Sequence, residues 1–451
     1  MTDTSNAQQS LMLELKEKAE SGTPEELQAL IAQLSPADLA RVLESSPSKR
    51  RAHLWGLIDD ELQGQVIHHI NSKIVPELIV NEPAADIARL LKKVGFDDDQ
   101  ADVLQHLPPG LAAEVLLEID AQDRTRVESL LDYPEHSAGG MMGTDIIAIQ
   151  PNINLETATQ YLRFHAPLPP TTDRIFVVNN QDEYLGVLPL TTLLVSDPAL
   201  SVREVMLTDT ISLPADMSSH DVAERFKRYD LVSAPVIDAN QRLVGRITVD
   251  DVVDVIVDEA DHSLMSMAGL DTEDDVFSPI IPTARRRAFW LGANLLTAFI
   301  AASVIDLFTD TIEKVVALAV LMPIVASMGG VAGSQTLTLV IRSMAQDELF
   351  ETNLMWLLRR ELAVGALNGV LWAVVVAVAA SLVFNDIMIG YIIASALIIN
   401  LVVAALSGAL LPSALKALGI DPAIAGTVVL TTITDVTGFM AFLGLATIVY
   451  G

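Results

Sequence analysis

The chain of 451 residues contains no cysteine. This absence excludes disulfide bonds, thiolate metal sites and a cysteine nucleophile. Basic residues are also scarce, because 28 Lys and Arg stand against 58 Asp and Glu, which gives a formal net charge of -30. Such an acidic chain repels the phosphates of nucleic acids and attracts cations, so we expect cation binding and no nucleic-acid partner.

Several motifs of catalysis and targeting are missing as well. The chain has no GxxxxGK[ST] phosphate loop and no H-E-x-x-H zinc motif, and its 8 histidines are scattered. A conventional enzyme is therefore the least favoured class. The first residues, MTDTSNAQQS, lack a basic region followed by an apolar one. We expect no cleavable signal peptide and a cytoplasmic N-terminal part.

Apolar residues are abundant, at 51% of the chain with a mean hydropathy of +0.41. A high apolar content and a large negative net charge can occur in one chain only if an acidic part and an apolar membrane part are separate. Five apolar runs follow Arg285-Arg-Arg287, each near the ~20 residues that span a membrane as a helix. They lie at about 288–307, 315–340, 361–383, 387–414 and 422–450.

The distribution of basic residues predicts the orientation of these spans. If the N-terminus is cytoplasmic, the basic residues near the spans gather on the cytoplasmic side. They are Arg285, Arg286, Arg287, Arg342, Arg359, Arg360 and Lys416. Five spans then place the C-terminus outside.

The last apolar run carries Asp435 near its middle, with no Lys or Arg in the run to pair with it. A carboxylate at the bilayer centre costs about 2.5–3.5 kcal/mol even on insertion scales. Thr427, Thr431 and either Thr434 or Asp435 share one helical face, which predicts a polar path. The alternative is a carboxyl that is protonated or hydrogen-bonded to a neighbouring helix.

The second run contains Met322-Pro-Ile-Val-Ala-Ser-Met-Gly-Gly-Val-Ala-Gly-Ser-Gln-Thr336. Its proline and glycines break a helix or let helices pack closely, and Ser334 and Gln335 add oxygen atoms. Tight packing and a pore lining are compatible interpretations of this segment.

The N-terminal part, about 11–137, consists of short amphipathic segments with internal repetition. Pro36-Ala-Asp-Leu-Ala-Arg-Val-Leu43 recurs as Ala84-Ala-Asp-Ile-Ala-Arg-Leu-Leu91. Repeated helices of this kind stack into a small superhelix. Asp97, Asp98, Asp99 and Asp102 form a dense acidic cluster near a helix start, which is interpreted either as helix capping or as a divalent-cation site.

A duplicated pattern occupies about 138–256. Met141-Met-Gly-Thr-Asp145 is matched by Val205-Met-Leu-Thr-Asp209, and each copy continues with a helical run and a strand hairpin. The pattern resembles a tandem CBS pair. In that family Thr248 and Asp251 match positions that contact the ribose of an adenine nucleotide, so ATP is a possible cofactor. The other interpretation is a pair that only dimerises.

An acidic connector follows. Asp251, Asp254, Asp258 and Asp261 fall at helical spacing on one face, and no Lys or Arg occurs between Arg246 and Arg285. Like charges at this spacing repel, so the face needs counter-charge. Hard oxygen ligands suit Mg²⁺, which keeps several waters. A solvated acidic helix is the alternative.

The order of these parts resembles the MgtE family of magnesium channels over nearly the whole chain. The most specific carriers are Gly329-Gly-Val-Ala-Gly-Ser-Gln335, Arg359-Arg-Glu361, Asp421-Pro-Ala423 and Thr431-Thr-Ile-Thr-Asp-Val436. The family has Asn where Val331 stands and an acid where His262 stands. Its members are homodimers in the membrane lipid, and their pore lies between the two membrane domains.

The resemblance implies roles for particular residues. Asp435 would select hydrated Mg²⁺, with Thr427, Thr431 and Gln335 lining the pore. Asp421 would lie at the cytoplasmic mouth. The regulatory carboxylates would be Asp251, Asp254, Asp258, Glu259, Asp261, Asp97, Asp98 and Asp102.

We therefore predict four parts: a helical acidic N-domain (1–137), an α/β tandem CBS pair (138–256), an acidic connecting helix and linker (257–284) and an all-α membrane domain (285–451). The predicted function is Mg²⁺ influx through a channel of the plasma (inner) membrane that cytoplasmic Mg²⁺ closes. The alternatives are a membrane-anchored metal or nucleotide sensor, an ion-coupled transporter, and a preference for Co²⁺ or Mn²⁺.

Overall fold

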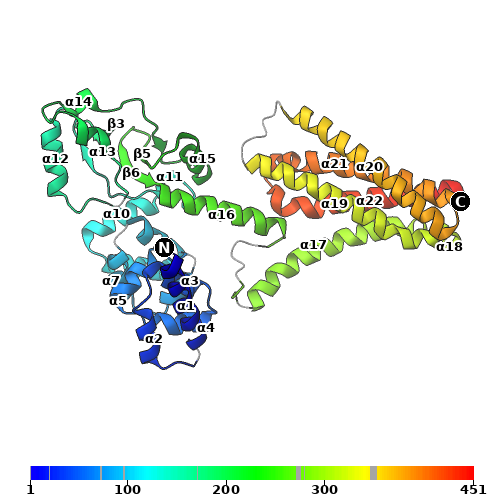
Figure 1. The fold of residues 1–451 in the computed structure, drawn as a ribbon, viewed down its shortest axis with the longest axis horizontal. Coiled ribbons are helices and arrows are strands. Elements are labelled where there is room, and N and C mark those ends of the chain that lie inside the picture. The colour runs from blue at the N-terminus through cyan, green and yellow to red at the C-terminus, as the bar shows by residue number, and fades with distance from the viewer. Residues whose placement is uncertain are drawn as a thin grey trace. The chain divides into compact units, whose positions relative to one another are not determined.

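A computed structural model of the chain describes residues 2–19, 21–71, 74–94, 97–169, 171–270, 276–278, 280–345 and 353–451 (Figure 1). The chain divides into two compact units, Met1–Glu259 and Ala260–Gly451. The division falls inside helix α16 (Val249–Met267), which contributes residues to both units. It also falls within the predicted connector, while the finer four-part division stays a prediction.

The first unit begins with short helices, as the sequence predicts. They are α1 (Thr2–Lys18), α2 (Pro24–Ile31), α3 (Pro36–Glu44), α4 (Ser48–Trp55), α5 (Asp60–Ile67), α6 (Val75–Ile79), α7 (Ala84–Val94), α8 (Asp97–His106), α9 (Pro109–Glu118) and α10 (Ala121–Leu131). The repeated segments form α3 and α7, and both bury the same apolar stripe, with Leu39 and Leu43 in the first and Ile87 and Leu91 in the second.

The duplicated module forms two small sheets with the same topology. The first contains β1 (Ala148–Ile149), β2 (Arg174–Val178) and β3 (Tyr184–Pro189), and the second contains β4 (Leu213–Pro214), β5 (Ser233–Ile237) and β6 (Leu243–Thr248). In each sheet the first two strands are parallel and the last two antiparallel. The accompanying helices are α11 (Ala138–Met141), α12 (Leu155–Phe164), α13 (Leu190–Val195), α14 (Val202–Val205) and α15 (Ser219–Tyr229).

The two copies of the module differ in how they are packed. The first copy has a hydrophobic core of its own, whereas the second copy shares one core with the N-terminal helices. Met142 lies at this junction: a Cβ on Gly245 of β6 would lie 2.4 Å from its sulfur atom. The helical N-terminal part and the second copy therefore pack as one body within the first unit.

The second unit is a helical bundle. It contains α17 (Ile280–Asp306), α18 (Thr309–Lys314), α19 (Ala317–Ala345), α20 (Leu354–Phe384), α21 (Ile387–Ala417) and α22 (Pro422–Tyr450). Among the described residues, five of these helices, all but α18, are long and apolar enough to cross a membrane. The structure agrees with the predicted class: a helical N-terminal part, two α/β copies with the same topology and, among the described residues, five long apolar helices.

Helix α21 is the most buried of the five, and small residues bring its neighbours close. A Cβ on Gly365 of α20 would lie 2.8 Å from the Cβ of Ala405, and a Cβ on Gly408 would lie 2.7 Å from the carbonyl oxygen of Gly333 in α19. Such close approach is typical of helix packing in membranes, where small residues replace the hydrophobic driving force.

Candidate ion pathway and carboxylate cluster

Helix α22 presents two neighbouring stripes. Its buried stripe, which includes Leu430, Thr434 and Gly438, packs into the bundle. The stripe one residue further along, with Thr427, Thr431 and Asp435, is partly exposed. The sequence left open whether Thr434 or Asp435 completes the threonine face. Asp435 does, since Thr434 is fully buried and donates to the carbonyl oxygen of Thr431 at 3.0 Å.

Asp435 is the ionisable residue of this face, and its charge is not compensated by a neighbouring side chain among the described residues. Its carboxylate makes no hydrogen bond or ion pair with any residue that the structure describes. The hydroxyl of Thr431 donates to the carbonyl oxygens of Thr427 and Val428, at 3.0 Å each. The face therefore offers acceptor oxygens to a visiting group, because the threonine donor is already used within the helix.

Helix α19 brings the glycine-rich segment against this face. It is a continuous helix with Pro323 inside, so the glycines serve close packing and do not break the helix. A Cβ on Gly330 would lie 4.0 Å from a methyl carbon of Thr431, and one on Gly333 would lie 3.0 Å from Leu430. The side chains of Val331 and Gln335 are exposed in the single chain.

Glu361 is a membrane-domain acid to which the sequence analysis assigned no role. It lies in α20 with only 4% of its surface exposed, and its carboxylate accepts a hydrogen bond from the Thr336 hydroxyl at 3.0 Å and another from Arg360. Glu361 is the first residue of the predicted third apolar run, so the sequence pattern did not indicate that its side chain is buried. The contact with Thr336 fixes α20 to α19, next to Gln335.

Asp421 begins α22, as the sequence suggests for a residue at the mouth. One carboxylate oxygen accepts the backbone N–H of Ala423 at 2.8 Å, and the other lies 3.3 Å from Nε2 of His262 in α16. Met267, near the end of α16, packs against a core formed by α19 and α22. The C-terminal part of α16 is thus attached to the two helices of the candidate pathway by polar and apolar contacts.

In the first unit, acids of α8 and of α16 influence one another electrostatically, while their role as regulatory ligands stays a prediction. Burial raises the pKa of Asp98 well above its usual range, and the charges of Asp251 and Asp99 add to this effect. Burial likewise raises the pKa of Asp102 to about 7, with contributions from Asp99, Glu135 and Asp251. The side chains of α8 and α16 therefore share one electrostatic environment, although they lie about 150 positions apart in the sequence.

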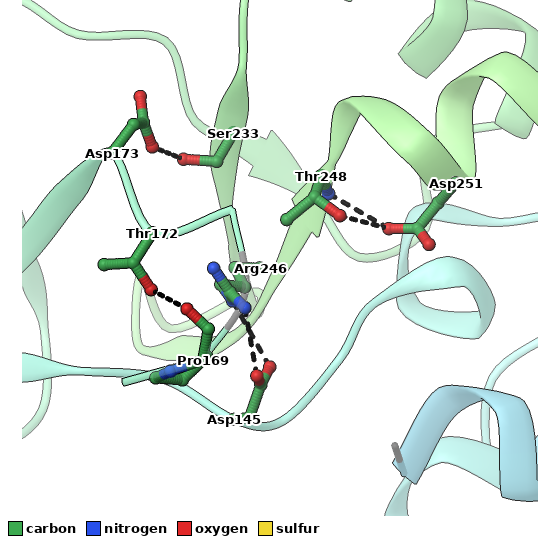
Figure 2. A network of polar contacts seen from close by, with 8 residues as sticks. All are labelled: Asp145, Pro169, Thr172, Asp173, Ser233, Arg246, Thr248 and Asp251. Atoms are coloured by element: carbon green, nitrogen blue, oxygen red, sulfur yellow. Dashed lines mark hydrogen bonds and ion pairs between the residues drawn. The ribbon is translucent and has the colours of Figure 1, made fainter. Parts of the chain in front are cut away.

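Asp251 has a second, structural role. Figure 2 shows it in the first turn of α16, where one oxygen accepts the N–H of Thr248 at 3.0 Å and the Thr248 hydroxyl at 2.9 Å. Burial raises the pKa of Asp251 to about 6 in spite of these bonds. Burial also raises the pKa of Asp254, with Asp258 the next cause.

The cap formed by Thr248 and Asp251 gives both residues a function without a ligand, so their contact with a nucleotide ribose stays a prediction. Nearby polar groups are also paired. Asp145 binds Arg246 with N–O distances of 2.9 and 3.2 Å, and the Ser233 hydroxyl donates to Asp173 (Figure 2).

His68 belongs to the same cluster and was not singled out from the sequence. Its Nδ1 lies 2.6 Å from an oxygen of Asp99, and this hydrogen bond raises the pKa of the imidazole, with further contributions from Asp99, Asp250 and Asp251. No local pattern links residues 68 and 99, because the loop after α5 meets α8 only in the folded chain.

The remaining predicted acids are less closely involved. Asp258 and Asp261 lie on the exposed side of α16, and an oxygen of Glu259 is 2.8 Å from Nδ1 of His220. The side chain of Asp97 lies outside the described residues. In the described part of the chain, no three Asp, Glu or His side chains are close enough to hold one metal ion. The acids are thus spaced more loosely than ligands around a dehydrated ion.

Comparison with known families accounts for both units. Residues 34–136 match the model of the MgtE intracellular N domain, residues 202–258 match a CBS domain, and residues 322–445 match the MgtE divalent cation transporter domain. The chain belongs to the MgtE family. It is accordingly a multi-pass membrane protein with an intracellular N domain. Membership in a transporter family also confirms the prediction that it is not an enzyme.

Curated MgtE relatives match along almost their whole length. The magnesium transporter MgtE of Bacillus subtilis is 29% identical over 426 residues, 94% of each chain. That of Thermus thermophilus is 29% identical over 444 residues, 97% of this chain and 98% of the relative. A crystal structure of the cytosolic domain of the Mg²⁺ channel MgtE in complex with ATP is 29% identical, with a TM-score of 0.49, and covers 54% of this chain and 99% of that one.

Proposed function

We propose that this protein is a Mg²⁺ channel of the plasma (inner) membrane, formed by two copies of the chain, with its C-terminus outside. The observation that carries the proposal is the Asp435 carboxylate. It lies midway along a membrane-spanning helix, partly exposed, and has no partner among the described residues. Such a residue is too costly to keep unless it serves a polar path.

The chemistry of the face suits a hydrated cation. Mg²⁺ loses its waters reluctantly, and those waters present hydrogen-bond donors outward. The Asp435 carboxylate and the hydroxyl oxygens of Thr427 and Thr431 can accept, so they bind the water shell and not the bare ion. An inside-negative potential favours entry by about 4.6 kcal/mol per 100 mV for a divalent ion.

Control of the channel rests on the acids of α8 and α16. While their charges are uncompensated, Asp98, Asp102 and Asp251 repel one another across the two helices, which favours separation. Cytoplasmic Mg²⁺ compensates these charges through its waters, in keeping with the loose spacing, and the helices stay together. Because α16 continues to His262 and Met267 at the pore helices, we infer that this cluster closes the channel.

Uptake by the purified protein in liposomes tests the proposal. We expect Mg²⁺ to enter down its gradient without a proton or sodium gradient and to slow as Mg²⁺ rises on the cytoplasmic side. A membrane-anchored sensor would give no uptake, and an ion-coupled transporter would stop when the second gradient is removed. Competition with Co²⁺ and Mn²⁺ establishes which divalent ion is preferred.

A further inference from the structure

Asn400 is a fully buried amide in the middle of the membrane bundle. It lies in α21 with 0% of its surface exposed, and its Nδ2 donates to the carbonyl oxygen of Val325 in α19 at 2.9 Å. Its Oδ1 is buried and has no hydrogen-bond partner among the described residues. A buried polar atom without a hydrogen-bond partner costs free energy of folding. An apolar side chain of similar size would avoid this cost, so packing alone does not explain an asparagine at this position.

The orientation of the amide follows from chemistry. The carbonyl oxygen of Val325 can only accept, so the NH₂ group must face it and the oxygen must take the other position. Flipping the amide would set two acceptors against each other. The unpartnered oxygen is therefore a consequence of the bond to Val325.

Two glycines make room for Asn400. A Cβ on Gly329 of α19 would lie 2.3 Å from Nδ2, and one on Gly438 of α22 would lie 2.8 Å from the same atom. Asn400 thus touches both helices at once. Gly438 lies three residues after Asp435, and Gly330, the neighbour of Gly329, faces Thr431.

We propose that Asn400 is a positioning residue for ion selection: it sets the separation of α19 and α22 at the level of Asp435. This inference rests on the proposed channel function. Asn400 does not touch the ion, because it is buried behind the two glycines. The hydrogen bond from its side-chain amide to Val325 instead fixes the position of the acceptor oxygens of α22 relative to α19. This position in turn sets the size of the hydrated ion that the oxygens can bind.

The test is the ratio of two uptake rates measured on one preparation, Mg²⁺ and Co²⁺. A variant that only lowers the amount of folded protein lowers both rates equally and leaves the ratio unchanged. For Asn400→Leu we expect the ratio to change by about fivefold, the effect of one lost hydrogen bond. Asn368→Leu is the matched control, since Asn368 is an exposed amide of α20 whose Nδ2 donates to the carbonyl oxygen of Val364 in its own helix.

A second pair of variants covers the case in which Asn400→Leu does not assemble. The three atoms nearest to a Cβ on Gly329 all belong to Asn400, so Gly329→Ala should impair assembly, and Gly329→Ala with Asn400→Ala should restore it. The restored double variant lacks the amide, so its ratio should again differ from that of the wild type.

An unchanged ratio in Asn400→Leu, or in the double variant where the single variant does not assemble, overturns the inference. The same holds if Asn368→Leu changes the ratio equally. These outcomes are distinct from failure of the channel proposal, in which the wild-type protein itself transports no Mg²⁺.

Discussion

The proposed function depends on single carboxylates, and their environments differ. Asp435 is partly exposed on a membrane helix without a described partner, whereas Asp102 lies in the middle of α8 and is influenced by the charges of three other acids. Asp251 is bonded to Thr248 and still has a raised pKa. Each lies where an uncompensated charge is costly, and under the proposed function a cation supplies the compensation.

Replacing Asp102 with Asn should stabilise the first unit when no divalent ion is present. The amide keeps the shape and removes the repulsion by Asp99 and Asp251. We expect a rise in melting temperature at pH 8 without Mg²⁺, and a smaller further rise on adding Mg²⁺ than in the wild type. Asp38→Asn, in α3, is a control outside the cluster. A lower melting temperature for Asp102→Asn without Mg²⁺ would contradict this assignment.

The raised pKa values also predict a pH dependence of stability. In the folded unit Asp102 titrates near pH 7 and Asp251 near pH 6, above the usual value of 3.8, so the folded state binds more protons than the unfolded state between these limits. Stability without divalent ions should therefore fall as pH rises from about 4 to 7, by at most about 4 kcal/mol for Asp102. Denaturant titrations across this range measure it, and an increase in stability over the same interval would refute it.

Among the helices, α16 contributes residues to both units. Its first turns carry Asp251 and Asp254 in the first unit, and its last turns place His262 and Met267 against α19 and α22 in the second. The helix is continuous across the division between the units, and the proposed control of the channel requires it to transmit a change from its first turns to its last.

Replacing Asp251, Asp254 and Glu259 with Asn, Asn and Gln should weaken inhibition by cytoplasmic Mg²⁺. Without their charges the cluster no longer depends on Mg²⁺ for compensation. We expect the half-inhibiting concentration to shift by about tenfold or more, which is within the usual range of coupling between sites. The shift is measured as uptake against cytoplasmic Mg²⁺, with Asp132→Asn as the control, and an unchanged curve would remove these residues from the control of the channel.

The sequence predicted elements better than contacts. The period of α22 located Asp435 and its threonines, and the acidic spacing of α16 located Asp251 and Asp254. His68, Glu361 and Asn400 were not assigned a role. Their importance comes from partners 25 or more positions away in the sequence, such as Thr336 for Glu361 and Val325 for Asn400. Periodicity carries no information about such partners.

In the whole molecule, the division into an acidic unit and an apolar bundle explains how one chain can be both strongly acidic and rich in apolar residues. A net charge of -30 and a mean hydropathy of +0.41 belong to different parts of one chain. The first unit holds the acids of α8 and α16, and the bundle holds Asp435 on α22.

Millimolar Mg²⁺ should therefore protect the first unit of the full-length protein from proteolysis. Compensation of the acids holds α8 and α16 together and shields the backbone around them. Limited proteolysis at rising Mg²⁺, with Na⁺ at equal ionic strength as the control, measures the effect. Cleavage rates that do not depend on Mg²⁺ would argue against closure of the channel by this cluster.

The most direct test of the account is Mg²⁺ uptake into liposomes by the Asp435→Asn variant. Asp306→Asn is the matched control, because it makes the same change at an exposed position at the end of α17. We predict that Asp435→Asn abolishes uptake while Asp306→Asn and the wild type transport alike. Normal Mg²⁺ uptake by Asp435→Asn would contradict the central claim that this carboxylate selects the ion.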